Sequence, residues 1–160
     1  MCGLLCDVVG VDAFVTLLQD ADPDPIASCQ TLQQCGYNDA AAANITVLDV
    51  LPKSGQQGTK FNINLFFKVT NEIATGTLAL NILPPSSSPA SAIENGNLLV
   101  NVPPGVYSLA GTLDTSMTSS MMPWSSGQYN VIGQVCDGTC GSKWAHAALL
   151  SQRQVAFVVQ

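Results

Sequence analysis

An alternation of apolar and polar residues runs through the sequence from Asn44 onward and restricts this part of the chain to β-structure. It is clearest over 61–69, where every second residue is apolar. Because successive side chains of a strand point to opposite faces, this period of two predicts strands that bury one face. Seven such segments are expected, separated by turns rich in Gly, Pro and Ser: 45–51, 61–69, 77–83, 97–102, 106–114, 128–136 and 150–159.

Seven short alternating strands predict an immunoglobulin-like antiparallel β-sandwich over residues 44–160. Tyr129, which follows Gly127 at the start of a strand, has the position of the tyrosine corner found in such folds. The 160 residues suffice for one such domain with a small addition. The predicted fold class is therefore α+β and mostly β.

The added part lies at residues 1–38, where apolar residues recur every three or four positions and predict a helix to about Gln19. Prolines in the following Asp-Pro-Asp-Pro segment end this helix. Asp24 can then cap a second helix, from Ile26 to Gln34, that has Pro25 in its first turn and ends at Gly36. Residues 1–38 are thus predicted to form a short helical hairpin.

Six cysteines lie in two groups, four within the first 35 residues and two close together near the C-terminus. An even number at short spacings favours disulfides over a metal site, and the chain has one histidine. Two parallel disulfides could clamp the hairpin, Cys2 to Cys35 and Cys6 to Cys29. If Cys29 and Cys35 are instead unpaired within this chain, the chain is expected to be a piece of something larger. Cys136 and Cys140 are expected to form a structural disulfide across a loop, because redox motifs use a two-residue spacer.

The net charge of −6 belongs entirely to the N-terminal part. Residues 1–39 contain six aspartates and no Lys or Arg, whereas residues 40–160 contain five acids and five bases. The absence of a basic patch argues against a nucleic-acid partner. A charged content of 10% is more typical of a secreted β-rich protein than of a cytosolic enzyme.

Metal and cofactor sites are not expected. Asp20, Asp22 and Asp24 have the spacing that opens a calcium loop, but prolines occupy the fourth and sixth positions of that loop. Asn44 opens the N-glycosylation sequon Asn-Ile-Thr at the junction of the two parts, where exposure is expected. His146 has no neighbouring residues in the sequence that would complete a catalytic triad.

Tryptophan and methionine residues occur together in the late loops. We expect them to cover the open end of the core, and the alternative is an adaptable apolar binding surface. This group comprises Trp124, Trp144, Met117, Met121 and Met122.

Three family resemblances follow from these motifs. The run from Cys6 through a hydrophobic helix to Pro25-Ile-Ala-Ser-Cys29 and Cys35 resembles the second half of a saposin B-type domain. The remainder is similar to the β-domain of countin-like secreted proteins of amoebae. The phrases that carry this similarity are Asn44-Ile-Thr, Pro103-Pro-Gly-Val-Tyr107, Pro123-Trp124, Gly127-Gln-Tyr129 and Val135-Cys-Asp-Gly-Thr-Cys-Gly141. A weaker similarity is to ML-type lipid-recognition sandwiches.

The resemblances imply a secreted or endolysosomal, non-catalytic protein with a signalling or adhesion role. Its implied partners are a lipid or membrane surface and other secreted or cell-surface proteins. At neutral pH the N-terminal aspartates would repel anionic lipid, and their protonation near pH 4 would remove that repulsion. The side chains expected to contact lipid are Leu4, Leu5, Val8, Phe14, Leu17 and Leu18.

Two other functions stay open. An ML-like carrier would hold a ligand between the sheets, in a cup lined by Phe61, Leu65, Phe67, Tyr107, Trp124 and Phe157. A hydrolase would require polar residues that converge with His146 in a cleft.

Overall fold

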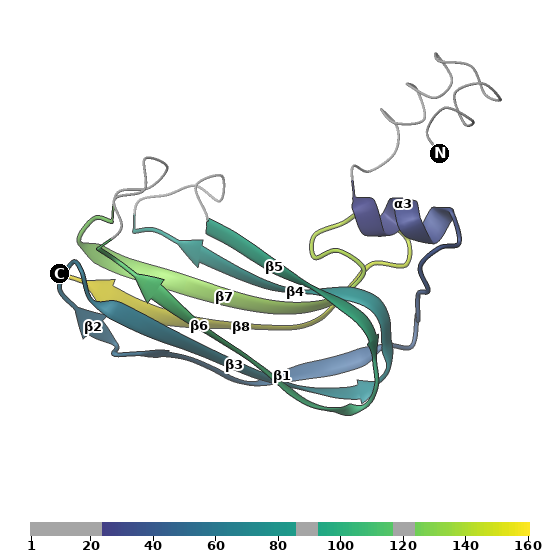
Figure 1. Cartoon of the computed structure of the whole chain (residues 1–160), viewed down its shortest axis with the longest axis horizontal. Helices are drawn as coiled ribbons and strands as arrows, with labels where there is room; N and C mark the ends of the chain where they lie inside the picture. The colour runs from purple at the N-terminus through teal and green to yellow at the C-terminus, as the bar shows by residue number, and fades with distance from the viewer. Residues whose placement is uncertain (1–23, 86–92, 117–123) are drawn as a thin grey trace, which may run out of the picture.

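The computed structural model describes residues 24–85, 93–116 and 124–160. Within these ranges the chain forms a sandwich of two facing β-sheets and one short helix, α3 (Pro25–Thr31). Figure 1 shows α3 beside one end of the sandwich, with the C-terminus at the other end. The expected mostly-β fold class is confirmed.

The first sheet has the strand order β1-β3-β6 and the second the order β2-β8-β7-β4-β5. All pairs are antiparallel except β2 with β8. The seven predicted strands are confirmed, and the periodicity missed β2 because two residues are too short to alternate. The strands are β1 (Ala42–Leu51), β2 (Ser54–Gly55), β3 (Lys60–Asn71), β4 (Ile73–Leu83), β5 (Ile93–Val102), β6 (Gly105–Asp114), β7 (Gly127–Asp137) and β8 (Ala148–Val159).

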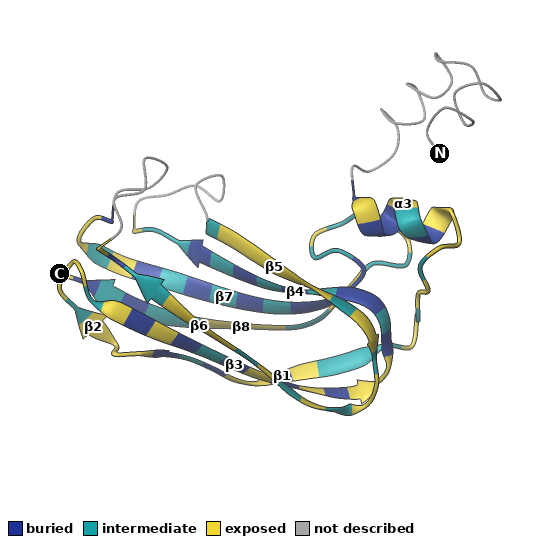
Figure 2. Ribbon diagram, viewed as in Figure 1, coloured by how far each residue is buried: buried dark blue, intermediate teal, exposed yellow. Residues whose placement is uncertain are grey.

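Aromatic side chains from both sheets meet in the middle of the core. The ring of Phe157 lies 4.6 Å from that of Phe61 and 5.3 Å from that of Tyr129, measured between centroids. Figure 2 shows buried residues alternating with less buried ones along the strands, and exposed residues over most of β5. The alternation in the sequence therefore marks the inner face of each sheet.

The predicted ligand cup coincides with this core. Phe61, Leu65, Phe67 and Phe157 are at most 2% exposed, and they belong to one cluster of buried side chains. In the same cluster Trp124 packs on Tyr129, with 5.1 Å between ring centroids, and the half-buried Tyr107 stacks on Phe67. These residues fill the space between the sheets themselves, so the structure does not support a ligand between them.

Tyr129 forms the predicted tyrosine corner. Its hydroxyl donates to the Ser125 carbonyl oxygen and accepts from the Ser125 backbone N–H, at 3.0 Å in both cases. The ring itself is fully buried. This arrangement fixes the chain where it enters β7 and satisfies the polar end of a core side chain.

The cysteine pairing differs from the predicted clamp. Cys29 is bonded to Cys35, with 5.3 Å between their Cα atoms, so the pairs Cys2–Cys35 and Cys6–Cys29 are wrong. Helix α3 ends at Thr31 rather than Gln34, and Gln33 then takes a φ of 56°, which reverses the chain. That reversal brings Cys35 back beside Cys29. The expected Cys136–Cys140 disulfide is present.

Helix α3 is the second helix of the predicted hairpin, while the first helix and its six lipid-contact residues lie outside the described residues. The division into domains 1–38 and 44–160 stays a prediction. Across the residues that are described, no helix has both the length and the apolar character needed to cross a bilayer.

The two tryptophans do not share a loop cluster. Trp124 is 8% exposed and covers the core where β7 begins, as expected for a residue that closes the sandwich. Trp144 lies in the loop after β7, at the other end of that strand, beside His146. The three methionines of the predicted cluster are outside the described residues.

Candidate functional site at the helical end of the sandwich

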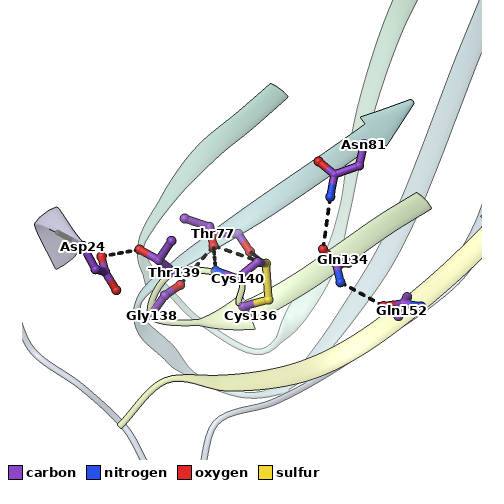
Figure 3. The surroundings of a disulfide bond; sticks show 9 residues. All are labelled: Asp24, Thr77, Asn81, Gln134, Cys136, Gly138, Thr139, Cys140 and Gln152. Atoms are coloured by element: carbon purple, nitrogen blue, oxygen red, sulfur yellow. Dashed lines mark hydrogen bonds between the residues drawn. A yellow bond between two sulfur atoms is a disulfide. The ribbon is translucent and has the colours of Figure 1, made fainter. Parts of the chain in front are cut away.

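The loop that joins β7 to β8, residues 138–147, is fixed to the sandwich by the Cys136–Cys140 disulfide and by Thr77 of β4. Figure 3 shows the Thr77 hydroxyl between Gly138 and Cys140. Thr77 Oγ1 donates to the Gly138 carbonyl and accepts from the Cys140 backbone N–H, both at 3.0 Å. The Gly138 N–H also donates to the Thr75 carbonyl at 2.9 Å. The loop is therefore a rigid platform at this end of the molecule.

Helix α3 is attached to this platform through its N-cap. The Asp24 carboxylate accepts from the Ile26 backbone N–H at 2.8 Å and from the Thr139 hydroxyl. Burial acts to raise the pKa of Asp24, but hydrogen bonds from Thr139, Ser142 and the helix N-terminus outweigh it and lower the pKa below its usual value. The predicted capping role of Asp24 is confirmed, and the same carboxylate also joins the helix to the sandwich.

The Asp24→Ala variant is expected to lose about 1–2 kcal/mol of unfolding free energy at pH 7, because an N-cap and a buried acceptor are removed. A lowered pKa means that the ionised carboxylate stabilises the fold above the unfolded-state pKa of 3.8. That contribution is lost as the pH falls through the folded-state pKa. Urea unfolding of both proteins should therefore show a difference at pH 7 that shrinks below pH 3.8.

Asp24→Asn is the matched control for this experiment. Asparagine is also a good N-cap and keeps the oxygen that accepts from Ile26 and Thr139. This variant should lie close to the wild type at pH 7. An equal loss in both variants would contradict the capping role.

An apolar groove of about 380 Å³ separates α3 from the outer face of β5. Leu98 and Val100 form its sheet side and are 63% and 54% exposed. In the antiparallel register they lie opposite Thr77 and Thr75 of β4. None of the residues that line the groove is charged: Pro25, Ile26, Cys29, Gln34, Cys35, Gly36, Thr75, Leu98, Val100 and Asn101.

Polar side chains cover part of this outer face. A row of amides crosses three strands: Asn81 donates to Gln134 at 3.4 Å, and Gln134 donates to Gln152 at 2.8 Å (Figure 3). The amides satisfy one another across β4, β7 and β8. The exposed apolar side chains of Leu98 and Val100 lie beside α3, outside this row of amides.

On the other side of the platform, a pocket of about 200 Å³ brings His146 next to two carboxylates. His146 Nδ1 lies 2.8 Å from Asp39 Oδ1, and Asp137 lines the same pocket. Tyr37 stacks on the imidazole with 3.7 Å between ring centroids, and the Trp144 ring meets it edge-on at 5.8 Å. The imidazole is thus held between two rings and a carboxylate.

This pocket gives the convergence of polar groups that a hydrolase would need around His146, but its lining offers no hydroxyl or thiol nucleophile. Its lining contains no serine, threonine or cysteine: Asn38, Asp39, Ala41, Asp137, Ala145, His146, Ala148 and Leu150. Nucleophilic catalysis of the triad type requires a hydroxyl or thiol within hydrogen-bond reach of the base. Among the residues that line this pocket, no side chain can supply that hydroxyl or thiol.

Sequence reasoning missed most of these residues. Asp39 and His146 are 107 positions apart, and Leu98 and Val100 have the ordinary pattern of a strand. The one available signal was the apolar character of both faces near the end of β5, where Leu98 and Leu99 are adjacent. The predicted sequon residue Asn44 is exposed within β1 rather than in a linker, and its glycosylation stays a prediction.

Comparison with family models covers nearly the whole chain. Residues 43–160 match the Countin C-terminal domain and residues 1–33 match the Countin N-terminal domain. The chain belongs to the countin family. The predicted resemblance of the sandwich to countin-like proteins is confirmed, whereas the matches support neither the saposin-like resemblance of the first 35 residues nor the ML-type one.

Among countin relatives, the chain is 36% identical to Countin-3 of Dictyostelium discoideum over 99% of its own length and 70% of the relative's. It is also 36% identical to Countin-1 of the same organism, covering 99% of this chain and 60% of that protein. A substantial part of each relative therefore has no counterpart in this sequence.

Solved structures share the fold of this countin-family chain at low identity. The DNA glycosylase AlkC of Pseudomonas fluorescens aligns over 84% of this chain and 34% of its own, with a TM-score of 0.54 and 17% identity. The C-terminal domain of wzt aligns over 80% of this chain and 83% of its own, with a TM-score of 0.51 and 10% identity. Such likenesses establish the sandwich architecture alone.

Proposed function

We propose that this countin-family chain is a secreted, non-catalytic protein that binds lipid surfaces through the end of the molecule that carries α3. The observation that carries the proposal is the uncharged groove between α3 and β5, with Leu98 and Val100 exposed along it. Exposed apolar side chains that line a groove are typical of surfaces that bind an apolar partner. An acyl chain matches a groove whose lining holds no charge.

Apolar residues also occur in the chain segments before and after α3. Residues 1–23, which carry the predicted lipid-contact side chains, connect directly to Asp24 at the start of α3. Leu32, at the other end of α3, is 59% exposed. Apolar groups expected to contact lipid therefore precede and follow α3 directly in the chain.

Secretion is proposed from the cysteines and the sequon. Two disulfides form between neighbouring cysteines, and disulfides persist in oxidising compartments. The Asn44 side chain is exposed, as a glycan acceptor must be. The chain would then act outside the cell or in the endolysosomal system, with no nucleic-acid partner and no cofactor.

The proposal predicts that the full chain co-sediments with phosphatidylcholine vesicles at pH 7. Replacing Leu98 and Val100 together by asparagine should reduce binding by about tenfold or more, because two apolar side chains no longer enter the lipid. Val106→Asn is the matched control, since Val106 is 69% exposed but lies on β6 in the other sheet. This control should bind as the wild type does.

Vesicles that contain phosphatidylserine test the charge of the acidic N-terminal part. Binding to them should be weaker than to neutral vesicles at pH 7 and should rise as the pH approaches about 4, where aspartates become protonated. Asp24 should contribute little to this change because its pKa is lowered by its hydrogen bonds.

Two outcomes would overturn the lipid assignment. One is equal, negligible binding to all vesicles at both pH values. The other is binding to intact Dictyostelium cells that is abolished by surface proteolysis while vesicles stay unbound, which would identify a cell-surface protein as the partner.

A further inference from the structure

A buried carboxylate with one unpaired oxygen lies in the pocket beside His146. Asp137, the last residue of β7, is 1% exposed, and its Oδ2 accepts one long hydrogen bond of 3.4 Å from the Asn38 backbone N–H. Its Oδ1 has no hydrogen-bond partner among the described residues. A buried polar atom left unpaired costs stability, and in native proteins such an atom commonly marks a missing partner.

The charges around Asp137 make it a poor place for an isolated anion. Burial raises its pKa, the nearby Asp39 carboxylate raises it further, and the Asn38 N–H and His146 only partly oppose this. The fold therefore holds a second carboxylate close to a buried first one, and no Lys or Arg lines the pocket. Bringing two like charges together is unfavourable unless a cation joins them.

The other side of the pocket is lined by apolar side chains. Ala41, Ala145, Ala148 and Leu150 supply small apolar walls. At about 200 Å³ the pocket is smaller than the roughly 300–1,000 Å³ of sites for drug-sized ligands. It therefore fits the end of a chain better than a whole ligand.

A metal ion is a weaker match to these groups. Within the described ranges, no group of three or more His, Cys, Asp or Glu side chains is placed to hold a metal. An organic cation needs fewer ligands, because it brings N–H donors of its own and carries methylene groups that the alanine walls can contact.

We propose that this pocket binds the cationic end of an aliphatic amine, a primary ammonium or guanidinium group, with Asp137 and Asp39 accepting its hydrogen bonds. His146, held by Tyr37 and Asp39, closes one wall and keeps the Asp39 carboxylate in place. The cation can come from a free amine or from a Lys or Arg side chain of a partner protein. The site is separate from the groove beside β5, and the inference does not depend on lipid binding.

The test is a titration of the ¹⁵N-labelled full chain, followed by the amide signals of Asn38, Asp39 and His146. The probes are n-butylammonium, a capped Gly-Lys-Gly peptide and, as the uncharged control, n-butanol. Both cations should give saturable shifts at these three amides and butanol should not. Added salt should weaken the binding, since the attraction is between charges.

Asp137→Asn keeps the shape of the side chain and removes its charge. It should bind both cations on the order of tenfold more weakly, because a charge-assisted hydrogen bond is lost. Glu94→Gln removes one negative charge from β5, away from the pocket, and should bind as the wild type does. Asp137→Asn should also unfold at higher urea concentration at pH 7, because the ionised form of a group with a raised pKa opposes folding.

The relative affinities of the two cations identify the natural source of the cation. Tighter binding of the peptide than of n-butylammonium assigns the site to a partner's side chain, and the reverse order assigns it to a free amine. The proposal is overturned if neither cation gives saturable shifts, if butanol gives the same shifts, or if Asp137→Asn and Asp39→Asn both bind as the wild type does.

Discussion

Phe157→Ala is expected to lower the free energy of unfolding by about 3–5 kcal/mol, a large share of the roughly 5–15 kcal/mol that stabilises a domain. Phe157 is 1% exposed, and its ring contacts the rings of Phe61 and Tyr129. Removing it leaves a cavity where the two sheets meet. Surrounding side chains can fill that cavity only in part, because the facing strands cannot move freely. In one sheet β3 is held between β1 and β6, and in the other β7 is held between β8 and β4.

Urea denaturation of the two proteins, with intrinsic fluorescence as the signal, measures this loss. Phe66→Ala is the matched control, since Phe66 has the same side chain but is 41% exposed on the outer face of β3. Its loss should be about 1 kcal/mol or less. Comparable losses in the two variants would mean that the core is not organised around Phe157.

Gly76→Ala is expected to cost about 3 kcal/mol or more, and to do so through the backbone rather than through a cavity. A Cβ at Gly76 would overlap the Cys136 carbonyl oxygen and come within 2.8 Å of Ile73 Cγ2. The carbonyl cannot move freely because Cys136 is bonded to Cys140 and paired with β4 and β8. The β4 backbone must shift instead, and the platform that holds α3 shifts with it.

Gly96→Ala provides the comparison within the same sheet. No atom lies within 4 Å of a Cβ added at Gly96 on β5, so alanine should leave stability unchanged or raise it by up to about 1 kcal/mol. Thermal unfolding of both variants, together with amide hydrogen exchange in α3, checks the prediction. Gly76→Ala should unfold at lower temperature and lose protection in α3. A Gly76→Ala protein as stable as Gly96→Ala would show that β4 and β7 do not approach this closely.

The strands and the corner residue could be predicted because their signals are local. In β3 the alternation from Phe61 to Val69 corresponds to burial at every second position. Tyr129 was identified from its place after Gly127, and Asp24 from its place before Pro25. In each case the cause of the structure involves only a few neighbouring residues. In a strand it is the alternation of side chains between the two faces, and at a helix start it is the need of the first N–H groups for an acceptor.

The cysteine clamp failed for a different reason. The predicted clamp requires a second helix that continues to Gln34, but α3 ends at Thr31 and the chain turns back through Gln33. Where a short helix stops depends on what it packs against as much as on its sequence. Cys29 therefore forms its disulfide with Cys35, across the turn that follows α3.

Neighbouring residues are enough to specify the β-sandwich, the capped helix before it and the disulfide loop after β7, so these features could be predicted. The loops that meet at the helical end could not, because their contacts depend on the whole fold. There the segment around Asp39 reaches His146 and Asp137 across about a hundred positions, and β5 turns Leu98 and Val100 toward α3. Such contacts arise from the packing of two sheets and their loops, and no local period encodes them.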